Sequence, residues 1–134
     1  MKLDAAYIAG IFDGEGFFTM SWRKDFGYLK CEFGISMAEE FLIDLLVKQF
    51  PRACKYNKGK SKLGNKDIFM FRLNGSYAED FVQLIEPYVI IKQKELEFWY
   101  KWKTMPKALP RQMTPEIMRA REALFNEYKA FRNK

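Results

Sequence analysis

The stretch that decides the fold is residues 7–18, which read YIAGIFDGEGFF. Asp4 is a typical N-cap, and the apolar residues behind it predict a helix. Small residues recur at three- and four-residue spacings and so share one helix face: Ala6, Ala9, Gly10, Asp13 and Gly14. Such a face lets a second backbone approach closely. Glycines on both sides of Glu15 allow a tight exit from the helix, which leaves this acid at the helix end.

Length and composition indicate one folded domain over residues 1–134. The chain is 49% apolar with thirteen Phe, which is enough for a core. The net charge of +6 fits either ordinary solubility or a polyanionic partner, with nucleic acid first. No apolar run reaches the roughly 18 residues of a membrane span, and the N-terminus lacks a signal-peptide pattern. We therefore expect an intracellular protein without a membrane partner, in an unknown compartment.

The residue types limit the chemistry. The chain has no histidine, which excludes histidine general bases, Ser-His-Asp and Cys-His arrangements and histidine zinc sites. Cys31 and Cys54 are isolated and are predicted to be reduced thiols. Any catalysis must use carboxylates, lysines, tyrosines or a bound metal.

Two segments alternate with period two and predict a hairpin, residues 17–24 and 28–37, with a turn at 25–27. Their apolar side chains face inward and their polar side chains outward. The polar face is either a solvated surface or a ribbon of hydrogen-bonding groups suited to a DNA groove.

A second hairpin is predicted after a helix at residues 38–50. It has strands at 53–57 and 67–73, with Lys55 and Asn57 on one face of the first strand. Between them, residues 58–66 hold four lysines. This loop is either a flexible solvated tip or a contact to phosphates.

The remaining residues are predicted to be helical. A helix capped by Ser76 runs to Ile85, Pro87 interrupts it, and an aromatic-rich helix follows. Residues 105–115 carry three prolines and are predicted to be a linker. A last helix over residues 114–133 has an apolar stripe, which indicates that it folds back on the domain.

Residues 8–16, IAGIFDGEG, resemble the LAGLIDADG motif of homing endonucleases. Two more blocks, around residues 33–46 and 81–94, also resemble that family, so the resemblance covers roughly residues 5–105. It implies an α+β fold in the order α-β-β-α-β-β-α with an antiparallel, saddle-like sheet. The helix at 114–133 is an extra C-terminal element.

The resemblance implies a homodimer, because family members with a single motif pair through their motif helices. The expected interface residues are Ala6, Ala9, Gly10 and Asp13. The implied reaction is a double-strand break at a long pseudo-palindromic DNA target, in intron or intein homing. Glu15 and the Gly14 carbonyl would bind Mg²⁺ or Mn²⁺, and Lys92 would act at the scissile phosphate. The predicted DNA contacts are Thr19, Ser21, Arg23, Lys30, Glu32, Lys55, Asn57, Lys58, Lys60 and Lys62.

Two departures and two alternatives stay open. Met37 stands where many family members have a polar residue, often Gln. The segment after it is shorter than in some members and has Glu39 and Glu40 where basic residues occur, so both departures put cleavage efficiency in question. The first alternative is a family-derived protein that cuts nothing, either an RNA-binding maturase or a DNA-binding regulator. The second is a plain dimeric structural domain. Glu15 itself could be an ordinary solvated turn acid.

Overall fold

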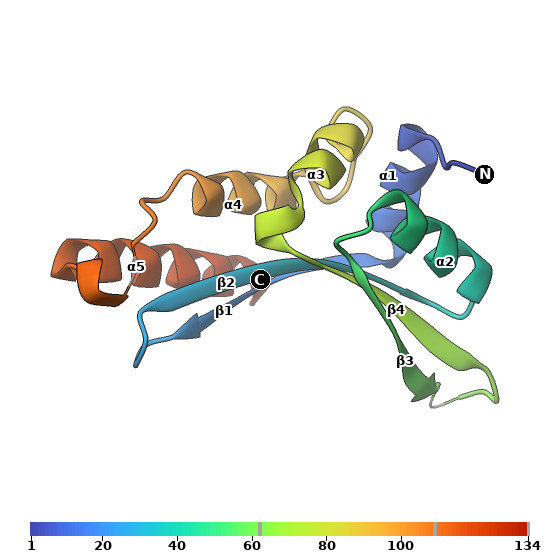
Figure 1. Ribbon diagram of the computed structural model, residues 1–134, viewed down its shortest axis with the longest axis horizontal. Coiled ribbons are helices and arrows are strands. Elements are labelled where there is room, and N and C mark those ends of the chain that lie inside the picture. The colour runs from blue at the N-terminus through green and yellow to red at the C-terminus, as the bar shows by residue number, and fades with distance from the viewer. Residues whose placement is uncertain (62, 109, 134) are drawn as a thin grey trace.

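The computed structural model describes residues 1–61, 63–108 and 110–133 (Figure 1). Within these residues, five α-helices and four strands follow one another in the α+β order expected from the sequence. The elements are α1 (Ala5–Glu15), β1 (Gly16–Arg23), β2 (Tyr28–Met37), α2 (Glu40–Gln49), β3 (Cys54–Lys60), β4 (Asp67–Asn74), α3 (Glu79–Ile85), α4 (Gln93–Lys103) and α5 (Pro115–Arg132), with short 3₁₀ turns at Gly75–Tyr77 and Pro110–Gln112. Among the described residues, no helix is long and apolar enough to cross a membrane.

The four strands form one antiparallel sheet in the order β1-β2-β4-β3. Figure 1 shows that the sheet arches and that the helices lie on its convex side, while the concave side is uncovered. Strand side chains alternate between two faces, so the buried Phe33 and Phe71 mark the helix-covered face. The other face is called the open face below.

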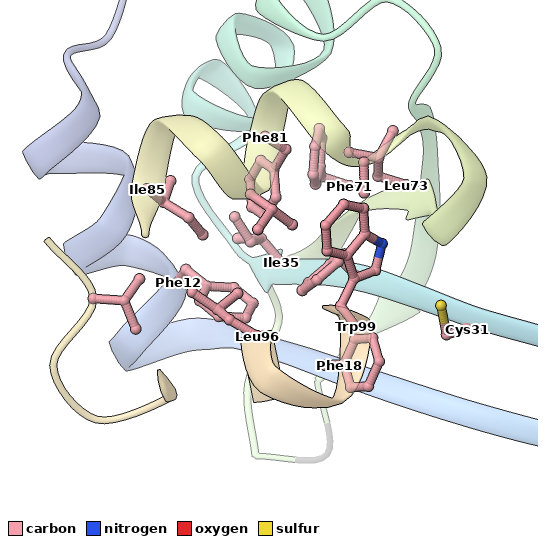
Figure 2. Close-up of a cluster of buried hydrophobic side chains, with 14 of the residues drawn as sticks. Phe12, Phe18, Cys31, Ile35, Phe71, Leu73, Phe81, Ile85, Leu96 and Trp99 are labelled. Atoms are coloured by element: carbon pink, nitrogen blue, oxygen red, sulfur yellow. The ribbon is translucent and has the colours of Figure 1, made fainter. Parts of the chain in front are cut away.

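The core is built around aromatic rings contributed by helices and strands alike (Figure 2). Phe12 of α1 lies 5.7 Å from Phe33 of β2 and 5.9 Å from Phe81 of α3, between ring centroids. Trp99 of α4 is buried, and its indole N–H donates to the Gly75 carbonyl at 3.0 Å. Burying each such ring contributes about 1.5–3 kcal/mol, so α1 is fixed firmly against the sheet.

Helix α5 folds back on the helix-covered side, against α4 and β1. Thr114 caps it by accepting the Ile117 N–H at 3.2 Å. The Tyr128 hydroxyl donates to the Phe18 carbonyl at 3.1 Å, and the Arg121 guanidinium donates to the Gly27 carbonyl at 2.7 Å. The C-terminal helix therefore braces the β1–β2 hairpin and leaves the open face uncovered.

Two local predictions need correction. β3 continues to Lys60, so the lysine-rich loop is shorter than residues 58–66. Ser76 lies inside a 3₁₀ turn capped by the Asn74 side chain, and α3 begins only at Glu79. Asn is a favoured cap, but Asn74 caps the 3₁₀ turn, and Ala78 stands at the N-cap of α3 without a side-chain hydrogen bond.

Candidate functional site

The end of α1 presents Glu15 at the surface. Gly14 and Glu15 are both exposed, and β1 begins at the next residue. The Gly16 N–H bonds to the Phe12 carbonyl and closes the helix. A Cβ at Gly16 would lie 2.3 Å from the Phe12 ring and 2.6 Å from its carbonyl oxygen. Only glycine fits there, so the tight helix exit predicted from the sequence is present.

Asp13 anchors a distant loop to the end of α1. Its carboxylate accepts the backbone N–H groups of Ile90 at 2.8 Å, Ile91 at 3.2 Å and Lys92 at 3.1 Å. Asp13 was predicted to support the helix ends at a subunit interface. The structure instead commits its carboxylate to the loop between α3 and α4 of the same chain.

Lys92 lies beside the same helix end. Its ammonium donates to the Phe12 carbonyl at 3.1 Å and to the Asp13 carbonyl at 2.7 Å. A cation is favourable there, because the last carbonyls of a helix lack partners and carry partial negative charge. Lys92 and Glu15 are thus brought to one end of α1. The ammonium keeps a third N–H, and its role at a phosphate stays a prediction.

Glu95 is a titratable neighbour that the sequence did not single out. One of its carboxylate oxygens is buried without a hydrogen-bond partner among the described residues. Burial raises the pKa of Glu95, while the positive charges of Lys92 and Arg132 lower it to a smaller extent. The first turn of α4 therefore holds an acid beside Lys92. No local pattern in the sequence marks it, because the burial comes from tertiary packing.

The small-residue face of α1 is only partly as predicted. Ala6 and Gly10 are exposed, and a Cβ added at Gly10 or Gly14 would meet nothing within 4 Å. Ala9 is fully buried in the core of its own chain. Its assignment to a subunit interface was wrong, because its side chain turns toward the sheet. Ala6, Gly10 and Gly14, each four residues apart, form the bare stripe.

Large apolar side chains are exposed near that stripe. Ile90 and Ile91 are 83% and 76% exposed, and Asp13 holds their backbone at the end of α1. Tyr7 is also exposed, on α1 itself. Apolar side chains gathered in this way are typical of a surface that another molecule covers.

The β1–β2 hairpin places five predicted DNA contacts on the open face. Because Phe18, Met20 and Cys31 are buried toward the helices, their strand neighbours point the other way. Across the pair, Thr19 lies opposite Glu32 and Ser21 opposite Lys30, and Arg23 lies near the hairpin turn, opposite Tyr28. A shallow hollow of about 280 Å³ opens here, lined by Thr19, Met20, Ser21, Lys30, Cys31, Glu32 and Arg72.

The β3 assignments were wrong for two residues. Lys55 and Asn57 lie opposite Phe71 and Phe69, which puts them on the helix-covered face. The Lys55 ammonium bonds Glu40 and Asp44 of α2, each at 2.6 Å. The bond to Asp44, followed by that to Glu40, raises the pKa of Lys55.

Asn57 stabilises an irregularity within strand β3. Its side-chain oxygen accepts the Gly59 N–H at 2.7 Å, at the point where the pairing register shifts. Cys54 and Tyr56 are the β3 residues that share the open face.

Two of the lysines assigned to the loop, Lys58 and Lys60, lie on strand β3, whereas Lys66 lies in the loop before β4. Lys58 lies at the bulge between Asn57 and Gly59, and Lys60 lies opposite Asp67. Both are exposed. Lys62 falls outside the described residues. Contact of Lys58, Lys60 or Lys62 with phosphates stays a prediction.

Arg72 of β4 is an open-face residue that sequence reasoning missed. Its guanidinium forms an ion pair with Glu32 and donates to the Tyr56 hydroxyl at 3.0 Å. Alternation along β4 could have found it, since Met70, Arg72 and Asn74 share one face. Met70 and Ile68 are apolar, however, so the sequence of this strand is nearly all apolar and does not mark the face that carries Arg72.

The end of α1 offers ligands of the right kind for a hard cation. Glu15 supplies a carboxylate and Gly14 a backbone carbonyl, and Mg²⁺ prefers oxygen ligands while keeping several waters. Within the described part of the chain, no cluster of three acidic, thiol or imidazole groups could hold a metal.

Comparison with known proteins identifies the fold. I-AabMI, a LAGLIDADG meganuclease solved with uncleaved DNA, matches with a TM-score of 0.70 and 16% identity over 92% of this chain and 44% of its own. I-GzeII, a LAGLIDADG homing endonuclease solved with a DNA target, matches with a TM-score of 0.69 and 22% identity over 94% of this chain and 44% of its own. The homing endonuclease I-CvuI, solved with its target in the presence of Ca, matches with a TM-score of 0.64 and 16% identity over 91% of this chain and 77% of its own. No family model and no curated protein matches the sequence.

The chain therefore has the LAGLIDADG homing endonuclease fold. The resemblance found in the sequence is confirmed at the level of the fold. The chain spans less than half the length of I-AabMI and I-GzeII and about three quarters of I-CvuI.

Proposed function

We propose that this chain is a site-specific DNA endonuclease that acts inside the cell as a homodimer with Mg²⁺ or Mn²⁺. The observation that carries the proposal is the placement of Glu15. It is an exposed carboxylate at the end of α1, with Lys92 beside the same helix end and a bare small-residue stripe along the helix. The reaction is a double-strand break at a long pseudo-palindromic target, of the kind used in intron or intein homing.

The metal chemistry rests on Glu15 and Gly14. A divalent cation held by their oxygens would supply an activated water and stabilise the leaving oxygen. The chain's own residues position this site. Gly16 fixes the turn after Glu15, and Asp13 fixes the loop that carries Lys92. Lys92 then keeps a positive charge beside the reacting phosphate.

The dimer is supported by the exposed surface around α1. Ala6, Gly10 and Gly14 leave room for a second helix at close range, and Ile90 and Ile91 are apolar groups that gain from being covered. A second copy related by a two-fold axis would bring two Glu15 side chains together. Two carboxylates at close range repel unless a cation lies between them. The shared site therefore needs both chains and metal.

DNA as the partner is supported by the open face. It is an arch with exposed polar side chains, on a chain of net charge +6. A two-stranded ribbon fits the major groove, and Arg and Lys are the residues that pair with guanine or phosphate. The similar proteins I-AabMI, I-GzeII and I-CvuI were each solved with DNA.

A nucleic-acid-binding protein that does not cut is the second candidate, either a maturase that binds RNA or a DNA-binding regulator. Two observations favour it. Met37 packs against the core and offers no polar group, and the Lys92 ammonium already has two backbone partners.

The deciding experiment incubates the purified protein with a randomised DNA-site library, in Mg²⁺ and separately in Ca²⁺, beside a Glu15→Gln variant. We expect the parent to cut selected sites in Mg²⁺ and the variant to bind the same sites without cutting. Site-specific binding without cutting by the parent would support the regulator. Absence of DNA selection together with retention of structured RNA would support the maturase.

The dimer is tested separately by sedimentation of a Gly10→Leu variant. A Cβ at position 10 meets nothing within 4 Å outside its own stretch of helix, so the monomer should fold. We expect this variant to sediment as a monomer and to lose cleavage. Glu97→Leu, an equally bulky change at an exposed α4 position, is the matched control and should remain dimeric.

A further inference from the structure

Arg72 lies at the centre of the open face. Its strand, β4, runs between β2 and β3, so Arg72 is on an inner strand and not on either edge strand of the sheet. It pairs across the sheet with Gly34 on one side and Cys54 on the other. An arginine inside an arch that straddles DNA faces the groove, whereas side chains at the rims face the phosphates.

Two side chains from the neighbouring strands hold its guanidinium. Glu32 of β2 accepts from Nη2, and the Tyr56 hydroxyl of β3 accepts from Nη1 at 3.0 Å. The Glu32 side chain is 13% exposed, against 39% for Arg72. The Glu32 carboxylate is therefore the more buried partner, and the Arg72 side chain keeps part of its surface open to solvent.

The N–H groups of the Arg72 guanidinium that remain without a partner show what it can still bind. Arginine has five N–H groups. Nε is buried without a partner among the described residues, and each terminal nitrogen donates once. Nη1 and Nη2 therefore each keep one N–H. A guanidinium that keeps one N–H on each terminal nitrogen can donate to the O6 and N7 acceptors that guanine presents in the major groove.

The hollow beside Arg72 provides space for a base edge. Its polar lining comes from Thr19, Ser21, Lys30 and Glu32 on β1 and β2. An arginine held in place before binding loses less side-chain freedom when it contacts its target. The Glu32–Arg72–Tyr56 contacts are therefore more than a balance of charge within the sheet.

We infer that Arg72, oriented by Glu32 and Tyr56, determines sequence specificity by contacting one guanine in each half of a two-fold symmetric DNA target. The inference rests on the proposed DNA-binding function. Because the two subunits are equivalent, the same position must be guanine in both half-sites.

The test selects sites from a randomised DNA library in Ca²⁺, using the parent, Arg72→Lys, Arg72→Gln and Tyr56→Phe. Lysine keeps the charge but lacks the planar fork. We expect one symmetric guanine, preferred by the parent on the order of tenfold, to lose its preference in both Arg72 variants. Tyr56→Phe should weaken the preference at the same position. Arg119→Gln, on the exposed side of α5, is the matched control.

Three outcomes overturn the inference. If Arg72→Lys and Arg72→Gln select the same sequence as the parent, the contacts of Arg72 with Glu32 and Tyr56 serve only to balance charge within the sheet. A uniform loss of affinity in Arg72→Gln, with the selected sequence intact in both variants, would make Arg72 a phosphate contact. If the parent itself selects no sequence, the proposed function fails and the inference falls with it. Circular dichroism melts of each variant show whether a change in selection follows from unfolding.

Discussion

The end of α1 and the centre of the open face hold their charged groups in different ways. At the end of α1, Asp13 and Lys92 bond to backbone groups, three N–H groups for the acid and two carbonyls for the base. On the open face, Arg72 bonds to the side chains of Glu32 and Tyr56. Backbone partners exist whatever the neighbouring residue is, whereas side-chain partners are lost when that residue changes.

This difference separates what must stay fixed from what can vary. A cleavage site needs its groups held in one geometry, and backbone partners achieve this because they are part of the fold. Recognition of a DNA sequence can change by replacing two or three side chains on a sheet that otherwise stays the same. The three predictions below test whether the two regions respond to mutation as this contrast requires.

The largest effect is expected for Asp13→Ala. It removes three hydrogen bonds from a charged acceptor and leaves the loop before α4 unanchored. We expect a loss of about 2–4 kcal/mol in the free energy of unfolding, measured by urea denaturation. Cleavage should fall more than DNA affinity, because Lys92 loses its position. Asp13→Asn keeps one acceptor oxygen and should lose about half as much. Equal urea midpoints for the parent and Asp13→Ala would show that the hydrogen bonds of Asp13 to backbone groups do not fix the end of α1.

A smaller effect, on DNA affinity, is expected for Lys30→Ala when set against Lys55→Ala. Lys30 is on the open face, so its loss should weaken binding and reduce the slope of log affinity against log salt by about 1. Lys55 is paired with Glu40 and Asp44 on the other face, so its loss should change neither quantity. Titration by fluorescence anisotropy at several salt concentrations measures both. A matching loss in Lys55→Ala would contradict the face assigned to β3.

The smallest effect is expected for Glu95→Gln, a half-buried acid near Lys92 with one carboxylate oxygen that has no hydrogen-bond partner among the described residues. Burial raises the pKa of Glu95, so ionisation costs more in the folded chain than in the unfolded chain. That cost appears as the pH rises above the unfolded pKa and is absent below it. The variant should therefore be slightly more stable than the parent at about pH 7 and equal to it at about pH 3. A variant less stable at neutral pH would show that attraction to Lys92 and Arg132 outweighs burial.

The sequence was most informative where the signal is local. The acid and glycines that end α1 are adjacent in the chain, and the β1–β2 hairpin alternates between a buried and an exposed face, so both could be predicted. β3 offers no such alternation, because all seven of its residues are exposed. Which of its side chains lie on which face of the sheet is decided by the pairing with β4. For this reason Lys55 and Asn57 were assigned to the wrong face.

The remaining parts of the site depend on contacts between distant residues. Asp13 meets a loop 77–79 positions away, and Arg72 meets Glu32 at a separation of 40. Neither spacing follows from helix or strand periodicity. Ala9 was misplaced for a related reason. The helix period groups it with Gly10, but only the docked sheet shows which side of α1 is covered.

The position of β3 at one end of the sheet also affects how the molecule behaves in concentrated solution. An edge strand presents a row of unpaired backbone N–H and C=O groups. A strand from another molecule could pair with them and begin a fibre. β3 carries Lys55, Lys58 and Lys60, and it is interrupted at Gly59, whose φ of +93° is one that side-chain-bearing residues rarely adopt. Lys55 is paired with Glu40 and Asp44, so repulsion comes from Lys58 and Lys60, and it opposes such growth together with the break in the ladder. The same strand that borders the open face therefore also protects the protein from aggregation.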